Sequence, residues 1–151
     1  MRRLKWFAIG EGAPRSAVVR LESALGCTFP ADFVDFAMKY AGSSNPDESE
    51  FTVSGKNSRQ RIGNFGAVLR IDGDDVDSVL AATANLGSQL PSGIVPVVGT
   101  GSGDYVCLDY RIAGLVTVSY FAHEKSGDDS LIPLARTFTD FIEMLREPTD
   151  N

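Results

Sequence analysis

His123 is the first residue to consider for chemistry, because the chain has no other histidine. An imidazole can act as a general base for a Ser or Cys nucleophile when a carboxylate orients it. Glu124 is the adjacent carboxylate, but neighbouring residues on a strand point to opposite faces. The chain also lacks a Gly-x-Ser-x-Gly nucleophile elbow. The sequence therefore favours a structural or interface role for His123. A small hydrolase that uses His123 with an acid or Cys107 stays as an alternative.

Three acids, Asp104, Asp109 and Glu124, belong to the residue type that performs acid–base work in glycosidases. Nothing in their spacing brings any two of them to the required distance, so turn capping and an ion pair with Arg111 are the expected roles. A metal site would need two distant cysteines to converge on His123. We therefore predict no catalytic residue, no metal and no cofactor.

Two loop motifs suggest ligands at first sight. Gly99–Asp104 reads Gly-Thr-Gly-Ser-Gly-Asp after an apolar run. A phosphate loop needs a helix next, whereas Tyr105–Leu108 reads as a strand, so a glycine-permitted turn is predicted. Asp72–Asp75 resembles the start of a calcium loop, but Asp77 stands where the loop needs glycine and Thr83 where it needs glutamate. Helix N-capping is the role predicted for these aspartates.

Helices are expected in four segments that carry apolar side chains at helical spacing. A proline opens each of the first two, and a glycine follows each of them. Thr137 with Asp140 resembles a capping box before the last helix. The predicted helices run from about Pro14 to Leu25, from Pro30 to about Ala41, from Asp74 to Leu86 and from Phe138 to Arg146.

Strands are expected where runs are apolar, alternating, or rich in Val and Tyr. Pro96 interrupts one run and predicts an edge position or a bulge, because proline cannot donate to a strand ladder. Polar residues in 43–50 and 125–130 predict exposed loops. The predicted strands are Phe51 to Val53, Ala67 to Ile71, Ile94 to Val98, Tyr105 to Asp109 and Leu115 to Phe121.

The order helix, helix, strands, helix, strands, helix clusters strands in sequence and places helices at both ends. This order predicts an α+β fold with a central, mainly antiparallel sheet flanked by N-terminal and C-terminal helices. A chain of 151 residues fits one domain, 1–151, with its core at about 13–146.

Charge narrows the classes of partner. The chain carries 20 acidic side chains against 14 Lys and Arg, a formal net charge of −6. Residues 41–130 alone hold twelve acids and six bases. Such a balance argues against sequence-independent nucleic-acid binding and against docking on anionic membranes. The acidic excess is explained either by a general contribution to solubility or by an acidic surface that binds a basic partner.

The cysteines and the N-terminal sequence indicate the cellular compartment of the protein. Cys27 and Cys107 do not make a disulfide framework and are expected to be buried thiols. The apolar run Trp6–Ile9 is too short for a signal-peptide core, and no stretch approaches the ~20 apolar residues of a membrane span. A cytoplasmic protein is predicted.

Short signals recur along the chain in a recognisable order. They are Leu25-Gly26, Phe29-Pro30, Gly101-Ser102-Gly103-Asp104, Leu108-Asp109-Tyr110, His123-Glu124 in a predicted strand, and the Leu134-Ala135 entry to the last helix. The ordered set resembles the SUKH superfamily, also called the cell-wall-assembly-regulator-like family, over roughly residues 13–146. The family usually ends its second helix near Asn-Gly, and here Ala41-Gly42 stands instead.

The resemblance implies a non-enzymatic binding domain with the α+β fold predicted above. Many bacterial members of the family are immunity proteins that bind a toxin directly, and many such toxins are nucleases with basic surfaces. Other members regulate cell-wall synthesis, so a regulatory or scaffold domain without a toxin partner stays open. A fold by itself does not fix a function.

The expected interface is the sheet face and the loops around the conspicuous polar residues of this region. Tyrosine and arginine are frequent interface hot spots, which motivates the two tyrosines and the arginine. The predicted partner-binding residues are Asp104, Tyr105, Asp109, Tyr110, Arg111, His123 and Glu124.

Overall fold

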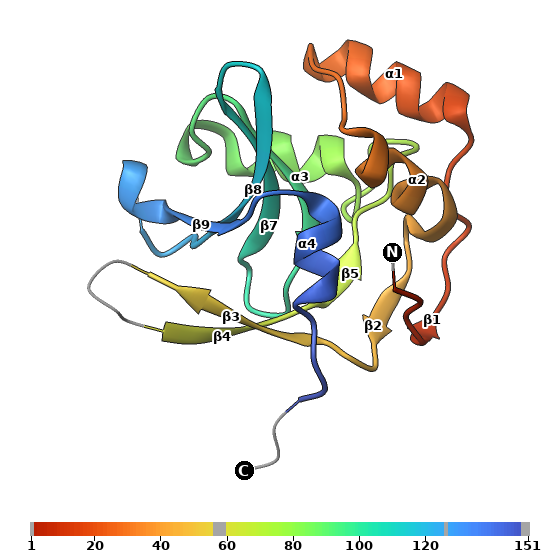
Figure 1. The fold of residues 1–151 in the computed structure, drawn as a ribbon. Coiled ribbons are helices and arrows are strands. Elements are labelled where there is room, and N and C mark those ends of the chain that lie inside the picture. Colours follow the sequence, from red (N-terminus) through yellow and green to blue (C-terminus); the bar gives the residue numbers. More distant parts are fainter. Residues whose placement is uncertain (1, 56–59, 126, 149–151) are drawn as a thin grey trace.

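The computed structural model describes residues 2–55, 60–125 and 127–148, and it confirms the predicted α+β class (Figure 1). In this part of the chain, seven antiparallel strands form the main sheet in the order β1-β2-β5-β6-β7-β8-β9. These strands are β1 (Trp6–Ala8), β2 (Ser44–Pro46), β5 (Ala67–Val68), β6 (Ile94–Gly99), β7 (Tyr105–Ile112), β8 (Leu115–Phe121) and β9 (Leu131–Ala135). A separate antiparallel pair consists of β3 (Glu50–Ser54) and β4 (Gln60–Asn64).

Helices cover the sheet, as the sequence predicts. They are α1 (Arg15–Leu25), α2 (Ala31–Tyr40), α3 (Val79–Leu86) and α4 (Phe138–Glu143), with short 3-10 turns at Gly87–Gln89 and Gly127–Ser130. Helices α2 and α4 contact each other, although about a hundred residues separate them in sequence, while α3 contacts β6 (Figure 1). The predicted N-cap Thr137 accepts a hydrogen bond from the backbone N–H of Asp140, which confirms half of the capping box.

Alternation along β7 divides its side chains between two apolar clusters. Val106 and Leu108 face the main core, which α1, α2, α4 and β3 also enter. Cys107 faces a second, smaller cluster with Ile94 and Phe121. Both faces of the central strands are therefore buried near the middle of the sheet, which explains why β6 reads as a continuous apolar run.

One predicted turn and one predicted strand irregularity take the form that the sequence suggested. The Gly99–Asp104 segment connects β6 to β7, with the backbone N–H of Thr100 bonded to the carbonyl of Asp104. The register between β6 and β7 shifts between Pro96 and Val98. Pro96 thus occupies a bulge in a central strand, the second of the two predicted alternatives.

The predicted start of the third helix at Asp74 is wrong. Residues 72–77 form bends and turns, and the helix begins only at Val79. The backbone carbonyl of Arg70 accepts a hydrogen bond from the N–H of Val79, and the backbone N–H of Arg70 donates to the carbonyl of Asp77. These two bonds hold the intervening Ser78 in an extended conformation beside Arg70. The hydroxyl of Ser78, not an aspartate, caps the helix.

Four strands escape the sequence prediction because they are short or carry loop-type residues. β2 lies inside the predicted loop 43–50 and reads Ser-Asn-Pro, yet it pairs with both β1 and β5. β9 contains Pro133, and β4 contains Gly63. The predicted loop 125–130 includes the 3-10 turn Gly127–Ser130, and residue 126 lies outside the described residues.

Candidate functional site

Strand β7 divides the predicted interface residues into two groups. Asp104 and Tyr105 stand where the strand begins, and Asp109, Tyr110 and Arg111 lie toward its other end. Five residues at ~3.3 Å each put roughly 16 Å between Asp104 and Asp109 along the strand. The predicted interface residues therefore form two separate clusters instead of one.

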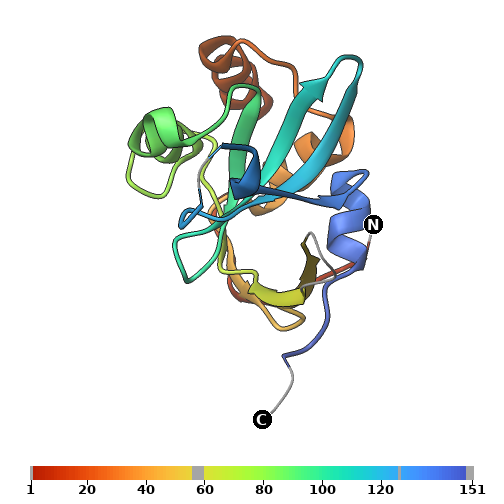
Figure 2. The ribbon, with the colours of Figure 1, turned by 90° about the vertical axis from the view of Figure 1, so that its left-hand side faces the viewer.

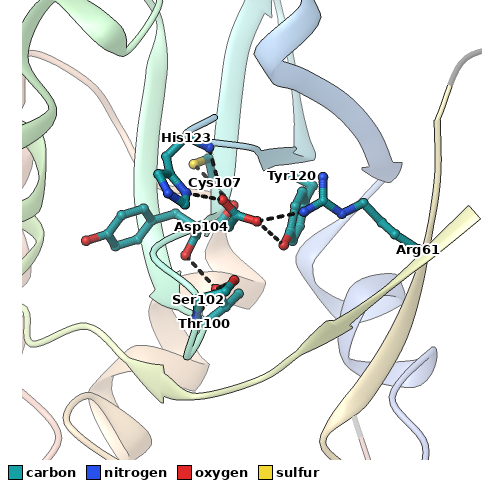
Figure 3. A network of polar contacts seen from close by, with 8 residues as sticks. Arg61, Thr100, Ser102, Asp104, Cys107, Tyr120 and His123 are labelled. Carbon is teal, nitrogen blue, oxygen red and sulfur yellow. Dashed lines mark hydrogen bonds and ion pairs between the residues drawn. The ribbon is translucent and has the colours of Figure 1, made fainter. Parts of the chain in front are cut away.

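A buried carboxylate, Asp104, forms the centre of the first group (Figure 3). Its side chain is 1% exposed. One carboxylate oxygen accepts from the hydroxyl of Tyr120 at 2.6 Å and from Arg61 at 3.2 Å. The other accepts from the backbone N–H of His123 at 3.0 Å and lies 2.6 Å from the imidazole Nδ1. Asp104 thus joins the β6–β7 turn, β8 and β4.

The electrostatics of this cluster keep Asp104 ionised. Burial opposes ionisation, but hydrogen bonds from Tyr120 and His123, with the charge of Arg61, outweigh it and lower the pKa of the Asp104 carboxyl. Burial and the neighbouring carboxylate raise the pKa of Tyr120, so the phenol keeps its donor proton. Arg61 also lies 5.3 Å from the ring centroid of Tyr120, within cation–π range.

His123 is placed differently from the expectation. β8 ends at Phe121, so His123 lies in the following turn and the strand alternation used to separate it from Glu124 does not apply. Its acidic partner is Asp104, 19 residues away in sequence. The imidazole lies over Gly103, where an added Cβ would come within 3.2 Å of it. Glycine's φ of +90° at this position is also one that other residues rarely adopt.

The Asp104–His123 pair has part of the geometry of a general base. In the neutral imidazole, a proton on Nδ1 shared with the carboxylate leaves Nε2 as an acceptor, and the side chain is 40% exposed. Cys107 is fully buried, and burial raises the pKa of its thiol well above the ordinary value. A buried protonated thiol is a poor nucleophile.

Asp109 centres the second group and holds Arg111. It accepts from the backbone N–H, Nε and Nη2 of Arg111, the last at 2.8 Å, and from the hydroxyl of Ser119 at 2.8 Å. Burial opposes ionisation of Asp109, but these hydrogen bonds and the charge of Arg111 lower its pKa. The expected ion pair between Asp109 and Arg111 is confirmed.

The other predicted residues have separate surroundings. The hydroxyl of Tyr110 donates to the carbonyl of Thr28, and burial next to Cys27 raises the pKa of the phenol. Tyr105 is half-buried against the smaller apolar cluster, and Glu124 is exposed. Cys27 is itself only half-buried, and Cys107 alone fits the expectation of a buried thiol.

Sequence reasoning missed Arg61 and Tyr120 as members of the Asp104 cluster. Arg61 comes from a strand that was not predicted, and Tyr120 is one of two adjacent aromatic residues in a run rich in apolar side chains. Over the described ranges, no group of three or more His, Cys, Asp or Glu side chains could hold a metal ion. Within the same ranges, no helix has the length and apolar character needed to cross a membrane.

Comparison with known proteins agrees with this architecture. A relative, the SPbeta prophage-derived uncharacterized protein YokK of Bacillus subtilis (strain 168), is 24% identical over 168 residues, which covers 99% of this chain and 86% of that protein. The sequence model of the SMI1 / KNR4 family (SUKH-1) matches residues 12–144, from just before α1 to just after α4. Because this match includes all four helices and every strand except β1, the chain belongs to the SMI1 / KNR4 family (SUKH-1).

Proposed function

We propose that this chain is a non-enzymatic protein-binding domain that acts as an immunity protein, neutralising a bacterial toxin in the cytoplasm by direct contact. The observation that carries the proposal is its membership of the SMI1 / KNR4 family (SUKH-1) over residues 12–144. Family members with this role bind their toxin rather than modify it. Nothing in the proposal requires a cofactor or a metal.

An exposed acidic loop supports a basic partner. Residues 72–77 carry four exposed aspartates, namely Asp72, Asp74, Asp75 and Asp77. Among them, the side chain of Val76 is 84% exposed. Asp72 and Asp75 form ion pairs with Arg20 and Arg70, so Asp74 and Asp77 carry the excess negative charge of the loop. An exposed apolar side chain beside acidic groups is suited to a complementary pocket with a basic rim, and the charge would speed encounter. A nuclease-type toxin offers a surface of that kind.

The predicted interface residues divide by exposure. Arg111, His123 and Glu124 are exposed enough to touch a partner, and the two tyrosines, Tyr105 and Tyr110, are partly so. Asp104 and Asp109 are buried and would act by positioning His123 and Arg111. We propose that partner contact is made by the exposed members and by the 72–77 loop.

Co-expression tests the immunity role. The product of a toxin gene found beside this gene is expressed in a sensitive bacterium, with and without this chain, and growth and co-purification are measured. Rescue of growth together with a stable complex supports the proposal. Growth arrest with no complex, while the chain is abundant and folded, contradicts it.

Matched charge reversals test the acidic loop. Asp74→Lys in the loop and Asp35→Lys on α2 change the net charge equally, and both positions are exposed. The loop variant should slow association with the toxin roughly tenfold at low salt, and the α2 variant should not. Equal association rates would remove the loop from the interface.

A regulatory or scaffold domain with no toxin partner is the first alternative. Gene neighbourhood separates it from the immunity role, because an immunity gene is expected beside its toxin gene.

The 2.6 Å Asp104–His123 contact favours the second alternative, a small hydrolase. Hydrolysis of p-nitrophenyl acetate above the uncatalysed rate, lost in His123→Ala and kept in Glu124→Ala, would support the enzyme. Equal rates in all three proteins would exclude it for that ester.

A further inference from the structure

A groove opens on the face of the sheet formed by the ends of β7, β8 and β9. Its volume is about 480 Å³, within the range of roughly 300–1,000 Å³ that is typical of ligand pockets. Thr117 and Ser119 of β8 lie between Asp109 of β7 and Pro133 and Ala135 of β9. Figure 2 shows this end of the sheet, where the β7–β8 hairpin extends past β9.

Two irregularities in the ladders border the groove. The β7–β8 register shifts between Asp109 and Ile112, and the β8–β9 register shifts between Val118 and Ser119. Bulges turn side chains out of the regular pleat and are frequent beside functional sites. Here they flank the positions of Arg111 and Leu134, both of which line the groove.

The charge of the groove is opposite to that of the molecule. Two arginines, Arg111 and Arg136, and one acid, Asp109, line it, so it is cationic by one charge in a chain of net charge −6. Asp109 is 6% exposed, and its carboxylate forms an ion pair with Arg111 and accepts a hydrogen bond from Ser119. Arg136 is exposed and makes no ion pair with any residue that the structure describes.

Arg111 is held in place before any partner arrives. Its Nε and Nη2 both contact the Asp109 carboxylate, and its backbone N–H bonds the same group. A side chain fixed in this way loses little conformational entropy on binding. Asp109 therefore acts as a positioning residue for the cation at the rim.

Apolar surface continues from the groove to the tip of the hairpin. Ile112 lines the groove and is 60% exposed, and it pairs across the hairpin with the exposed Leu115. Exposed apolar side chains beside a groove with cationic groups indicate a protein contact rather than simple solvation. Pro133 cannot donate to an added strand, so side-chain insertion fits this site better than strand addition at β9.

We propose that the β7–β9 groove binds a segment of a partner protein that inserts an apolar side chain and places a carboxylate against Arg136 and Arg111. This site goes beyond the proposed function, because it does not depend on the partner being a toxin. It also has the opposite polarity to the 72–77 loop. A partner that used both would meet one acidic and one basic surface of this chain.

Peptide titration of the whole chain tests the site. The probes are acetyl-Asp-Leu-Phe-Glu-amide and acetyl-Lys-Leu-Phe-Lys-amide, followed by amide chemical shifts in ¹H–¹⁵N spectra. The acidic peptide should shift the amides of Thr117, Ser119 and Ala135 in a saturable way. The basic peptide should bind at least about tenfold more weakly, since like charges face each other at the rim.

Arg136→Glu and Arg15→Glu form the matched pair of variants, because both positions are exposed and Arg15 lies on α1, outside the groove residues. We expect Arg136→Glu to weaken the acidic peptide about fivefold or more and Arg15→Glu to leave its affinity unchanged. The proposal is overturned by equal affinity for both peptides, by shifts confined to other surfaces, or by no saturable shift up to about 10 mM. Concentration-dependent shifts of the same amides without peptide would assign the groove to a second copy instead.

Discussion

Asp104 shows how one buried charge can determine the position of several segments. Four hydrogen-bond contacts converge on its two oxygens from Tyr120, His123 and Arg61. Arg61 comes from β4, whereas Tyr120 and His123 lie at the end of β8 and in the turn after it. A buried carboxylate is costly unless it is paired, and removing it leaves its donors without an acceptor. Asp104 therefore stabilises the fold and also holds His123 in place through direct contacts.

Asp104→Asn should lower the free energy of unfolding by about 2–3 kcal/mol, because the neutral amide loses charge-assisted hydrogen bonds in a buried site. Urea denaturation followed by circular dichroism measures this change. Asp74→Asn, at an exposed loop position, is the matched control and should change stability by less than about 0.5 kcal/mol. Equal effects of the two substitutions would contradict the role assigned to Asp104.

Acid should destabilise the fold through Asp104 and Asp109. Both carboxyls have a folded-state pKa below the ordinary value of 3.8. Their stabilisation is therefore fully present above about pH 4 and is lost as the pH falls toward the folded pKa values. The midpoint of urea denaturation should decrease as the pH is lowered from about 6 to about 2.5. The decrease should be smaller in Asp104→Asn than in the unmodified protein. An unchanged pH profile in that variant would show that Asp104 does not contribute.

The β3–β4 hairpin shows how an element outside the main sheet reaches the site. Phe51 of β3 is fully buried and contacts Tyr120 and Phe141 through edge-on ring pairs. Across the hairpin, Gly63 pairs with Phe51. An added Cβ at Gly63 would overlap the Phe51 ring. The absence of a side chain there leaves room for the Phe51 ring, and Arg61 of the same hairpin contacts Asp104.

Gly63→Ala should therefore lower the free energy of unfolding by about 1–3 kcal/mol, because a packed aromatic ring must move. Thermal denaturation gives the comparison with Gly101→Ala, whose added Cβ meets nothing within 4 Å. A melting temperature equal to that of the Gly101 variant would show that the ring moves aside freely.

At the scale of the whole molecule, one apolar cluster in the described part of the chain joins the main sheet, the helices α1 to α4 and the β3–β4 hairpin. Hydrogen bonds made by residues near both termini further stabilise this shared core. Arg146 exchanges backbone hydrogen bonds with Glu50, and Arg2 donates to the carbonyl of Leu145. A shared core of this kind unfolds as one unit.

We therefore expect a single cooperative transition, with far-ultraviolet and near-ultraviolet circular dichroism giving the same midpoint in urea. Trp6 is the only tryptophan and packs against Phe36 and Phe65, so its fluorescence should report the same midpoint. An earlier transition in fluorescence alone would show that the edge strand β1 and its neighbour β2 unfold separately.

Local patterns in the sequence were enough to predict much of this fold. Helix spacing predicted α1 and α2 to within a residue or two, because apolar stripes, prolines and glycines act over a few positions. The order of helices and strands predicted the α+β class. The glycine turn before Tyr105 and the Asp109–Arg111 pair could also be predicted locally, since each lies within a few consecutive residues.

The tertiary structure decided what distant segments do to one another. β2 is a strand because β1 and β5 satisfy its backbone groups, not because its residues favour strands. The helix after residues 72–77 begins late because Arg70 holds Ser78 extended. His123 meets Asp104, not Glu124, because a turn follows β8. In each case the deciding contact joins segments distant in sequence or overrides a local preference, so residue propensities and spacing do not reveal it.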